Sequence, residues 1–417
     1  MLFVVTTLNF ADRATLSMAA PFIGKKLGLT PVQLGYAFSA FGWSYTALQI
    51  PSGLLLDRLG SRWVYGVGLF VWSLFTFLQG TVGFFAGGTA FVLLFCFQFL
   101  IGVGEAPAFP ANSRITAMWF PSHERGFASA IFNSSQYFAL AVFNPLMGWI
   151  VRDFGWQVVF YVMGAGGIVL AFAWLAAVRD PTQHPRVSAT ELEYIQRGGG
   201  LANLTVQKTG LRWADVRVLV TNRLMIGVCV GQFCLNTITW FFLTWFPSYL
   251  IHVRGMTIMS AGIASSLPAM VAFGGGLLGG ATSDLMLRRG FTLTVARKTP
   301  IVIGLILSGT IMLANFADTQ WLVIGIMSLA FFAKGFGALG WVVISDSAPK
   351  EMVGLSGGIF NCAGNLASIL TPIVIGYILS ATESYNGALI FVGTMGILGA
   401  LSYLFLVGEI KRLELTD

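Results

Sequence analysis

The chain has 417 residues, of which 56% are hydrophobic and only 10% are charged. Soluble domains carry about 25% charged residues, so this composition argues against a water-soluble fold and makes lipid part of the solvent. The formal net charge of +7 would suit a nucleic-acid partner, unless the basic residues are placed by membrane topology.

Apolar stretches of membrane-spanning length follow one another along the chain. A helix needs roughly 20 apolar residues to cross a bilayer, and the sequence predicts an all-α polytopic membrane protein with twelve transmembrane helices. The expected ranges are 2–23, 35–56, 63–85, 89–111, 127–150, 157–178, 224–250, 259–283, 300–316, 321–345, 355–380 and 387–407. No cleavable signal peptide is expected, because charged residues lie in the first stretch and no small-residue cleavage site follows it.

Basic residues mark one side of these predicted spans. Most of the 24 Lys and Arg lie at one set of loop ends, and the opposite set has only Lys25, Lys26, Arg152 and Arg254. The positive-inside rule makes the basic side cytoplasmic and places both termini there. The basic charge is therefore a signal of topology, and no nucleic-acid partner is expected.

The longest polar stretch divides the predicted spans into two sets of six. The sequence predicts an N-terminal bundle at 1–178, a cytoplasmic central loop at 179–223 and a C-terminal bundle at 224–417. Within the loop, residues 187–197 begin with Ser and Thr followed by acidic residues. This is an N-cap pattern, and it predicts a short helix along the cytoplasmic surface.

A short motif recurs after the second and the eighth predicted span. Residues 53–62 and 280–290 both contain Gly, then Asp four residues later, then a cluster of Arg and Gly. Internal repeats of this kind are typical of transporters whose binding site lies at the repeat interface. Chance similarity is the alternative, because Gly and basic residues are common at cytoplasmic helix ends.

The stretch 53–62 matches the Gly-x-x-x-Asp-Arg-x-Gly-x-Arg signature of the major facilitator superfamily. Five further stretches are similar to its anion:cation symporter branch, and in particular to bacterial D-glucarate/galactarate carriers. They are NFADRATLSMA (9–19), FSAFGWSYTALQIP (38–51), GEAPAFPANSR (104–114), NTITWFFLTWFPSYL (236–250) and FGALGWVVISDSAPKE (336–351). The resemblance implies two pseudo-symmetric six-helix halves and a monomeric proton symporter for a sugar-acid dianion. It also implies alternating access in the bacterial inner membrane.

Four charged residues lie inside predicted spans: Asp12, Arg13, Glu105 and Lys334. Each costs at least ~2.5–3.5 kcal/mol at a helix centre, so each is a candidate functional residue, with a structural ion pair as the alternative. Adjacent residues point about 100° apart around a helix. We therefore expect Arg13 to face the central cavity and Asp12 to face a neighbouring helix.

The resemblance implies that Arg13 binds the substrate carboxylate and that Asp12 and Glu105 are the protonation sites. A planar guanidinium can bind both carboxylate oxygens. Pro107 and Pro110 follow Glu105 and are expected to loosen the helix there. Burial of a carboxyl group favours its protonated form, as a proton carrier requires.

The predicted choice between a dicarboxylate and a monocarboxylate substrate depends on Lys334. Trp341 is seven residues further on and is expected to share its helical face, which would place an ammonium and an aromatic ring on one wall. Arg13 and Lys334 come from different halves and can hold the two ends of a dicarboxylate, which favours an aldarate over an aldonate. The alternative is a Lys334 that only reaches toward the interface.

Four polar residues, Tyr45, Gln136, Gln232 and Asn361, match substrate-contacting positions of the family. Their side chains can hydrogen-bond sugar hydroxyls, and ordinary interhelical hydrogen bonds are the alternative. The family motif also implies contacts of a cytoplasmic gate. These would involve Asp57, Arg58, Arg62, Asp284 and Arg288.

Gln98 departs from the family pattern, in which an Arg usually precedes the fourth-span Glu by seven residues. Losing this cation weakens the attraction of anions and removes a possible partner of Glu105. A sensor of the same fold that does not transport is therefore compatible with the sequence. Proton symport of an aldonate, such as galactonate, or of a hexuronate is compatible with it as well.

No metal, cofactor or enzymatic activity is expected. The four Cys lie in apolar segments, and the chain has no CxxC motif or His/Cys cluster. The three His lie in loops, far apart in sequence, and no nucleophile–base motif accompanies them. The expected partners are a small sugar-acid anion, protons and the lipid bilayer.

Overall fold

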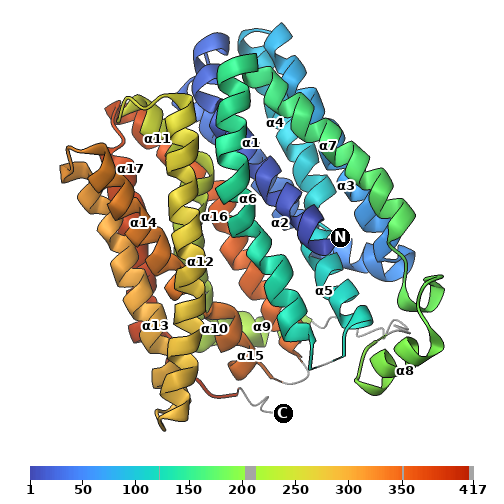
Figure 1. The fold of residues 1–417 in the computed structure, drawn as a ribbon. Coiled ribbons are helices and arrows are strands. Elements are labelled where there is room, and N and C mark those ends of the chain that lie inside the picture. The colour runs from blue at the N-terminus through green and yellow to red at the C-terminus, as the bar shows by residue number, and fades with distance from the viewer. Residues whose placement is uncertain (122, 202–212, 350–351, 413–417) are drawn as a thin grey trace. The chain divides into compact units, whose positions relative to one another are not determined.

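The computed structural model describes residues 1–121, 123–201, 213–349 and 352–412. In these ranges the chain forms helices and connecting turns, without a β-strand (Figure 1). The chain divides into two compact units. We call residues 1–29 and 40–209 unit 1, and residues 30–39 and 210–417 unit 2. The predicted boundaries at 178 and 223 stay a prediction, and residues 202–212 of the predicted central loop lie outside the described residues.

Unit 1 is a bundle of long helices with one short helix at its end. The helices are α1 (Leu2–Leu27), α2 (Pro31–Leu59, from Ala40 onward), α3 (Ser61–Gln79), α4 (Gly87–Glu105), α5 (Ala108–Trp119), α6 (Arg125–Phe154), α7 (Trp156–Ala177) and α8 (Ala189–Arg197). A 3₁₀ turn at Gly80–Phe84 extends α3. The short α8 lies past the end of α7 and next to the end of α5 (Figure 1).

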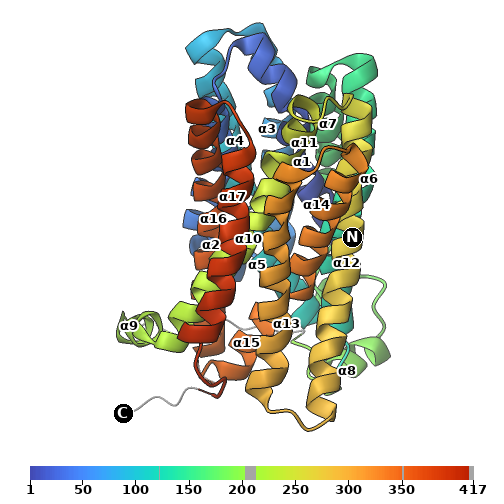
Figure 2. The same ribbon diagram turned by 90° about the vertical axis from the view of Figure 1, so that its left-hand side faces the viewer.

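Unit 2 is built in the same way, and the first turns of α2 pack onto it. Its helices are α9 (Trp213–Thr221), α10 (Arg223–Thr244), α11 (Phe246–His252), α12 (Ile258–Arg288), α13 (Leu293–Ser308), α14 (Gln320–Phe336), α15 (Gly340–Ser347), α16 (Val353–Thr382) and α17 (Asn386–Leu401). A 3₁₀ segment at Gly309–Phe316 extends α13. Figure 2 shows α17 beside α10 and α13, as their contacts require.

Each of the twelve expected spans falls on helical segments of the described chain. Nine helical stretches of the described residues are long and apolar enough to cross a membrane. The helices α1, α2 and α6 are not among them, and α1 carries the charged pair Asp12 and Arg13. The all-helical membrane architecture is confirmed, whereas the count of twelve spans stays a prediction.

Three spans that the sequence predicts as continuous are interrupted. The fourth breaks between Glu105 and Ala108, next to Pro107, which lacks an amide hydrogen for a helical hydrogen bond. The seventh breaks at Trp245, just before Pro247. The tenth breaks between Phe336 and Gly340, where no proline occurs but two glycines flank the turn. Helix ends thereby come to lie inside the bundles.

The predicted helix at 187–197 is confirmed as α8. Its cap is the Ser188 hydroxyl, which accepts a hydrogen bond from the amide of Glu191 at 3.1 Å. Tyr194 donates to Glu124 at 2.7 Å, and this hydrogen bond raises the pKa of the Tyr194 phenol. Arg125 donates to the carbonyl of Gly199 at 2.5 Å and to that of Ala117 at 3.1 Å. The segment that follows α7 is thus fastened to the end of unit 1 where α5 ends.

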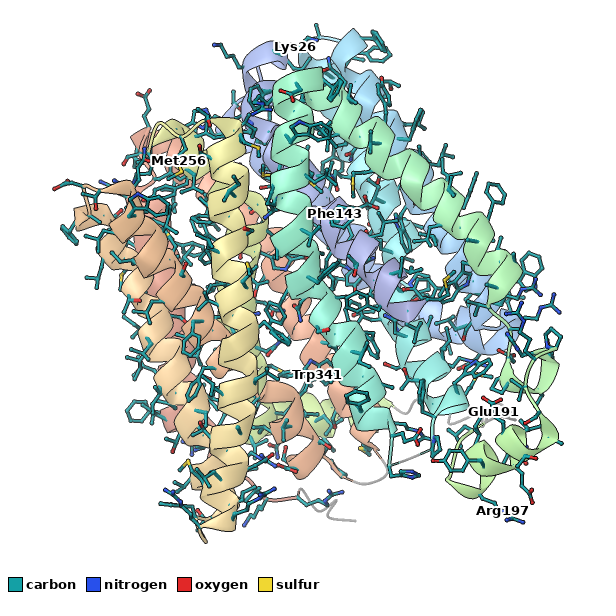
Figure 3. All side chains as sticks on the ribbon, viewed as in Figure 1. Lys26, Phe143, Glu191, Arg197, Met256 and Trp341 are labelled. Atoms are coloured by element: carbon teal, nitrogen blue, oxygen red, sulfur yellow. The ribbon has the colours of Figure 1, made fainter. Side chains whose placement is uncertain are left out.

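The labelled side chains in Figure 3 identify the two ends of unit 1. Lys26 lies at one end, and Glu191 and Arg197 of α8 lie at the other. Lys25 and Lys26, which the sequence assigns to the side opposite the basic loops, therefore lie far from α8. Which of these two ends is cytoplasmic stays a prediction.

Candidate functional site

A buried ion pair joins α1 to the end of α4. The Arg13 Nε atom donates to Glu105 Oε2 at 2.9 Å, and the two side chains are 7% and 0% exposed. Close contact of α3 with α4 helps to bury this carboxylate, because a Cβ on Gly68 would lie 2.5 Å from the carbonyl oxygen of Gly104. The structural ion pair that the sequence left open is therefore present.

Asp12 faces away from this pair, toward α3. Its Oδ2 atom accepts a hydrogen bond from the indole Nε1 of Trp72 at 3.1 Å, and Asp12 is 5% exposed. The expectation that Asp12 faces a neighbouring helix is met. Asp12 and Arg13 thus contact different helices, as the angle between adjacent helical residues requires.

Aromatic rings enclose the guanidinium of Arg13. Its Cζ atom lies 5.0 Å from the ring centroid of Phe10, 4.8 Å from that of Phe41 and 4.9 Å from that of Tyr45. Tyr45 itself is buried and stacks on Phe41 with centroids 5.1 Å apart. Such rings attract a cation by their quadrupole, so they can hold the guanidinium in place when its carboxylate partner is lost.

The charged side chains of unit 1 keep unused hydrogen-bonding capacity. Within the described chain, Asp12 Oδ1, Arg13 Nη2 and Glu105 Oε1 are buried and have no hydrogen-bond partner. Buried polar atoms are normally paired, so these atoms can accept a proton or bind a ligand without first breaking a protein hydrogen bond.

Lys334 of unit 2 is buried in an aromatic environment. It lies near the end of α14, is 6% exposed, and its Nζ atom lies 5.4 Å from the ring centroid of Phe331. Phe331 stacks in turn on Phe242 of α10, with centroids 4.3 Å apart. Within the ranges that the structure describes, no carboxylate forms an ion pair with Lys334. An unpaired buried ammonium is costly, and an anionic ligand would relieve that cost.

The expectation that Trp341 shares a helical face with Lys334 is wrong. The argument needed one continuous helix, but α14 ends at Phe336 and α15 begins at Gly340. Trp341 is 51% exposed, and its ring packs edge-on against Phe360 at 5.0 Å. Figure 3 shows Trp341 toward the end of unit 2 opposite Met256.

The remaining predicted ligands lie on α6, α10 and α16. Gln232 Nε2 donates to Asn236 Oδ1 at 3.3 Å on α10, and the backbone carbonyl of Asn361 accepts from Asn365 at 2.9 Å on α16. Gln136 on α6 donates to the carbonyl of Asn133 at 3.1 Å. These contacts lie within single helices and leave part of each amide free for further partners. Their role in binding stays a prediction.

Gln98 is buried on α4. Glu105 nevertheless has a cationic partner, because Arg13 occupies that role. The concern that the loss of an Arg at position 98 leaves Glu105 without a partner is therefore removed.

The two aspartates of the repeated motif, Asp57 and Asp284, pair with arginines that lie outside the motif. Asp57 accepts from Arg114 of α5 at 2.5 Å, and Asp284 accepts from Arg297 of α13 at 3.3 Å. Arg297 also donates to Asp346 at 2.9 Å and to Ser283 at 2.8 Å.

Arg62 donates from its Nε and Nη2 atoms to the carbonyl of Leu175, at 3.0 and 2.6 Å. Arg114, Arg297 and Asp346 were not predicted from the sequence. Each is a charged residue next to the end of a predicted span, which could have drawn attention to it. Its partner, however, lies far along the chain and could not be predicted from the sequence. Arg58 and Arg288 are exposed.

Comparison with protein families gives one match that covers nearly the whole chain. The model described as Major Facilitator Superfamily matches residues 2–296 and 290–415. Among solved structures, a bacterial homologue of the human lysosomal transporter Spinster, in an inward-facing and occupied conformation, aligns with a TM-score of 0.77. It is 17% identical, with 97% of this chain and 95% of that chain covered. At this identity the likeness shows the fold alone.

Closer relatives carry transporter names. The chain is 56% identical to the probable galactarate/D-glucarate transporter GudP of Bacillus subtilis (strain 168), with 100% of this chain and 92% of that protein covered. It is 53% identical to the probable galactarate/D-glucarate transporter GudP of Escherichia coli (strain K12), with 100% and 94% covered. The D-galactonate transporter of Escherichia coli O6:H1 is 41% identical, with 99% and 95% covered.

Proposed function

We propose that this chain, which belongs to the Major Facilitator Superfamily, is a proton-coupled symporter that imports D-glucarate and galactarate by alternating access. Relatives at 56% and 53% identity bear the names of galactarate/D-glucarate transporters, which supports the substrate. The observation that carries the coupling is the buried Arg13–Glu105 pair. The proposal places twelve spans in a bacterial inner membrane, with both termini cytoplasmic and the carrier acting as a monomer.

Charge balance explains how protons and substrate are linked. With both carboxylates ionised, Asp12, Arg13 and Glu105 together carry one negative charge, and a proton on Asp12 makes the cluster neutral. A second proton, on Glu105, removes the charge that holds Arg13. Arg13 stays within its aromatic rings and can then bind a substrate carboxylate through its planar fork.

Lys334 supplies the second positive charge. A dianion bound to Arg13 and Lys334 is neutralised, whereas a monoanion leaves one of the two cations without a partner. Because a buried unpaired charge is costly, the site favours an aldarate over an aldonate. Tyr45, Gln136, Gln232, Trp341 and Asn361 are proposed to contact the sugar hydroxyls and the carbon chain that bears them.

The membrane potential opposes the entry of a dianion, so uptake must be coupled to the entry of protons. One charge moved against 100 mV costs about 2.3 kcal/mol, so a dianion that enters a negative interior faces about 4.6 kcal/mol. Two protons cancel this cost and let the proton gradient drive uptake. Release into the cytoplasm follows when Glu105 loses its proton and reclaims Arg13, which displaces the substrate carboxylate.

The test is uptake of labelled D-glucarate into proteoliposomes, with an inward proton gradient imposed or collapsed. Gradient-dependent uptake that resists excess galactonate is expected. Uptake that galactonate blocks at equal concentration would move the assignment to an aldonate symporter, which the relative named D-galactonate transporter makes the second candidate. Saturable binding without uptake would indicate a sensor.

A further inference from the structure

Unsatisfied polar side chains are concentrated in one unit. Some buried side-chain N and O atoms of the described residues have no hydrogen-bond partner. In unit 2 they belong to Asn315, Ser356 and Thr371. In unit 1 they belong to Asn9, Asp12, Arg13, Thr46, Gln49, Ser61, Tyr65, Ser73, Thr76, Gln79, Glu105, Asn112, Arg114, Thr116 and Asn144. Buried polar atoms without protein partners normally bond to internal water, so the interior of unit 1 offers more bonding positions to water than that of unit 2.

One group of these side chains leads from the carboxylates toward the end of unit 1 where α3 begins. Asn112 Nδ2 of α5 donates to Thr6 Oγ1 of α1 at 3.0 Å. The Tyr65 hydroxyl of α3 interacts with both of these side chains but has no direct hydrogen-bond partner. Thr6, Tyr65 and Asn112 are at most 1% exposed, so the group lies inside the bundle.

The same group lies next to side chains that interact with the two carboxylates. The Asn9 amide of α1 lies beside Glu105, again outside direct hydrogen-bond geometry. The ring of Tyr65 packs at 6.1 Å from that of Trp72, whose indole donates to Asp12. A bridging water bonds almost as well as a direct partner, and water can take that place at the buried, unpartnered polar atoms of Asn9, Tyr65, Glu105 and Asn112.

The far end of the group reaches the basic side of unit 1. Tyr65 lies one turn after the start of α3 and packs on Trp174 with ring centroids 4.5 Å apart. Trp174 donates from its indole to the carbonyl of Arg62 at 3.1 Å. The positive-inside rule assigns this side to the cytoplasm.

We propose that Thr6, Asn9, Tyr65 and Asn112 form a water-bridged relay inside unit 1, along which the coupled proton passes from Glu105 to the cytoplasm. This inference rests on the proposed symport. It assigns the proton an exit through the interior of one bundle, so the proton can leave without following the substrate.

The hydroxyl and amide side chains of the relay are suited to different roles in proton transfer. Hydroxyl groups can accept one proton while donating another, so Thr6 and Tyr65 can pass a proton along with the waters. Amides donate and accept in fixed directions, so Asn9 and Asn112 orient the waters. In each step one O–H bond breaks as the next forms. The net change is a carboxylate at Glu105, paired with Arg13, and one proton in cytoplasmic water.

The test compares two double variants in proteoliposomes. Thr6→Val with Tyr65→Phe removes both relay hydroxyls, and Thr76→Val with Tyr403→Phe is the matched control. Tyr403 is a tyrosine of unit 2 that is buried like Tyr65, at 2% exposed. Thr76 is also 1% exposed with an unsatisfied hydroxyl, but it lies on the other side of Trp72 along α3. For each protein, gradient-driven D-glucarate uptake, glucarate–glucarate exchange and the effect of D₂O on uptake are measured.

The relay variant is expected to lose about 100-fold or more of gradient-driven uptake, since positioned proton transfer contributes about 10²–10⁴-fold. Exchange, which needs no deprotonation, should be preserved, and uptake should become sensitive to D₂O. Thr6→Ser, which keeps the hydroxyl, should retain wild-type uptake and guards against a folding defect.

Relay and control variants with equal uptake and equal D₂O effects would overturn the relay while leaving the symport intact. A wild-type protein without proton-coupled glucarate uptake would instead overturn the proposed function, and the relay with it.

Discussion

The two units treat a buried charge beside a helix break in opposite ways. In unit 1, α4 ends at Glu105, and Arg13 neutralises the carboxylate. In unit 2, α14 ends two residues after Lys334, and its ammonium faces the ring of Phe331. Among the described residues no carboxylate pairs with Lys334, so the charge in unit 1 is satisfied without a ligand and the charge in unit 2 is not.

This difference suggests separate tasks for the two units. A charge that is paired inside the protein can be switched, because a proton on one partner releases the other. A charge without a protein partner cannot be switched in this way, but it selects for a ligand of opposite charge. Coupling would then reside in unit 1 and selectivity for a second carboxylate in unit 2.

The largest effect is expected for Arg13→Met. Breaking a buried ion pair by removing one partner costs about 3–5 kcal/mol, and the proposed anchor of the substrate is lost as well. We expect a much lower melting temperature in detergent and no D-glucarate binding by calorimetry. In the double variant Arg13→Met/Glu105→Gln, stability should recover while binding stays absent. A single variant of wild-type stability would mean that the pair is not a strong interaction.

Glu105→Gln tests the switch itself. A glutamine mimics the protonated acid permanently, so Arg13 stays available for substrate but no proton can be released. Gradient-driven uptake should fall to background, exchange should persist, and the dependence of glucarate affinity on pH should weaken, with only the contribution of Asp12 left. Uptake measured with and without a pH gradient is the check, and persistent gradient-driven uptake would contradict the role of Glu105.

A smaller and selective effect is expected for Lys334→Met. Hydrogen bonds to charged groups contribute about 1.5–3 kcal/mol, which corresponds to roughly 10- to 150-fold in affinity. D-glucarate binding should weaken by this factor, while galactonate binding should be unchanged or improved. An equal loss for both ligands would show that Lys334 does not recognise the second carboxylate.

The smallest effects concern the motif aspartates. Exposed ion pairs contribute about 0–1 kcal/mol, and the side chains of Asp57 and Asp284 are 48% and 65% exposed. Asp284→Asn should matter least, because Arg297 keeps Asp346 and Ser283 as partners. Asp57→Asn leaves Arg114 without its carboxylate and should lower the melting temperature more. The reverse order would contradict this difference in partners.

The sequence predicted those features that depend on one helix alone, such as the position of each helix along the chain. The expected ranges fall on helices, and Pro107 and Pro110 predicted a loosened helix after Glu105, where the structure has a full break. The break after Phe336 was missed, because glycines in an apolar stretch are equally compatible with a continuous helix. That error produced the wrong placement of Trp341 relative to Lys334.

Pairing between helices was beyond the reach of sequence reasoning. Arg13 and Glu105 are 92 positions apart, and Asp57 and Arg114 are 57 apart. Each residue could be singled out by its cost in the membrane, but no spacing rule connects residues on different helices. The buried hydroxyls and amides around Tyr65 were missed for the same reason, since polar side chains on separate helices give no common pattern.

The fastening of α8 has a consequence for synthesis of the chain. The bonds of Tyr194 and of the backbone around Gly199 are made to Glu124, Ala117 and Arg125, all of which precede α8 in the chain. Domains generally fold as units during translation, at about 5–20 residues per second. Once Leu201 has left the ribosome, unit 1 can close without waiting for unit 2, and only residues 30–39 must await their later neighbours on α16.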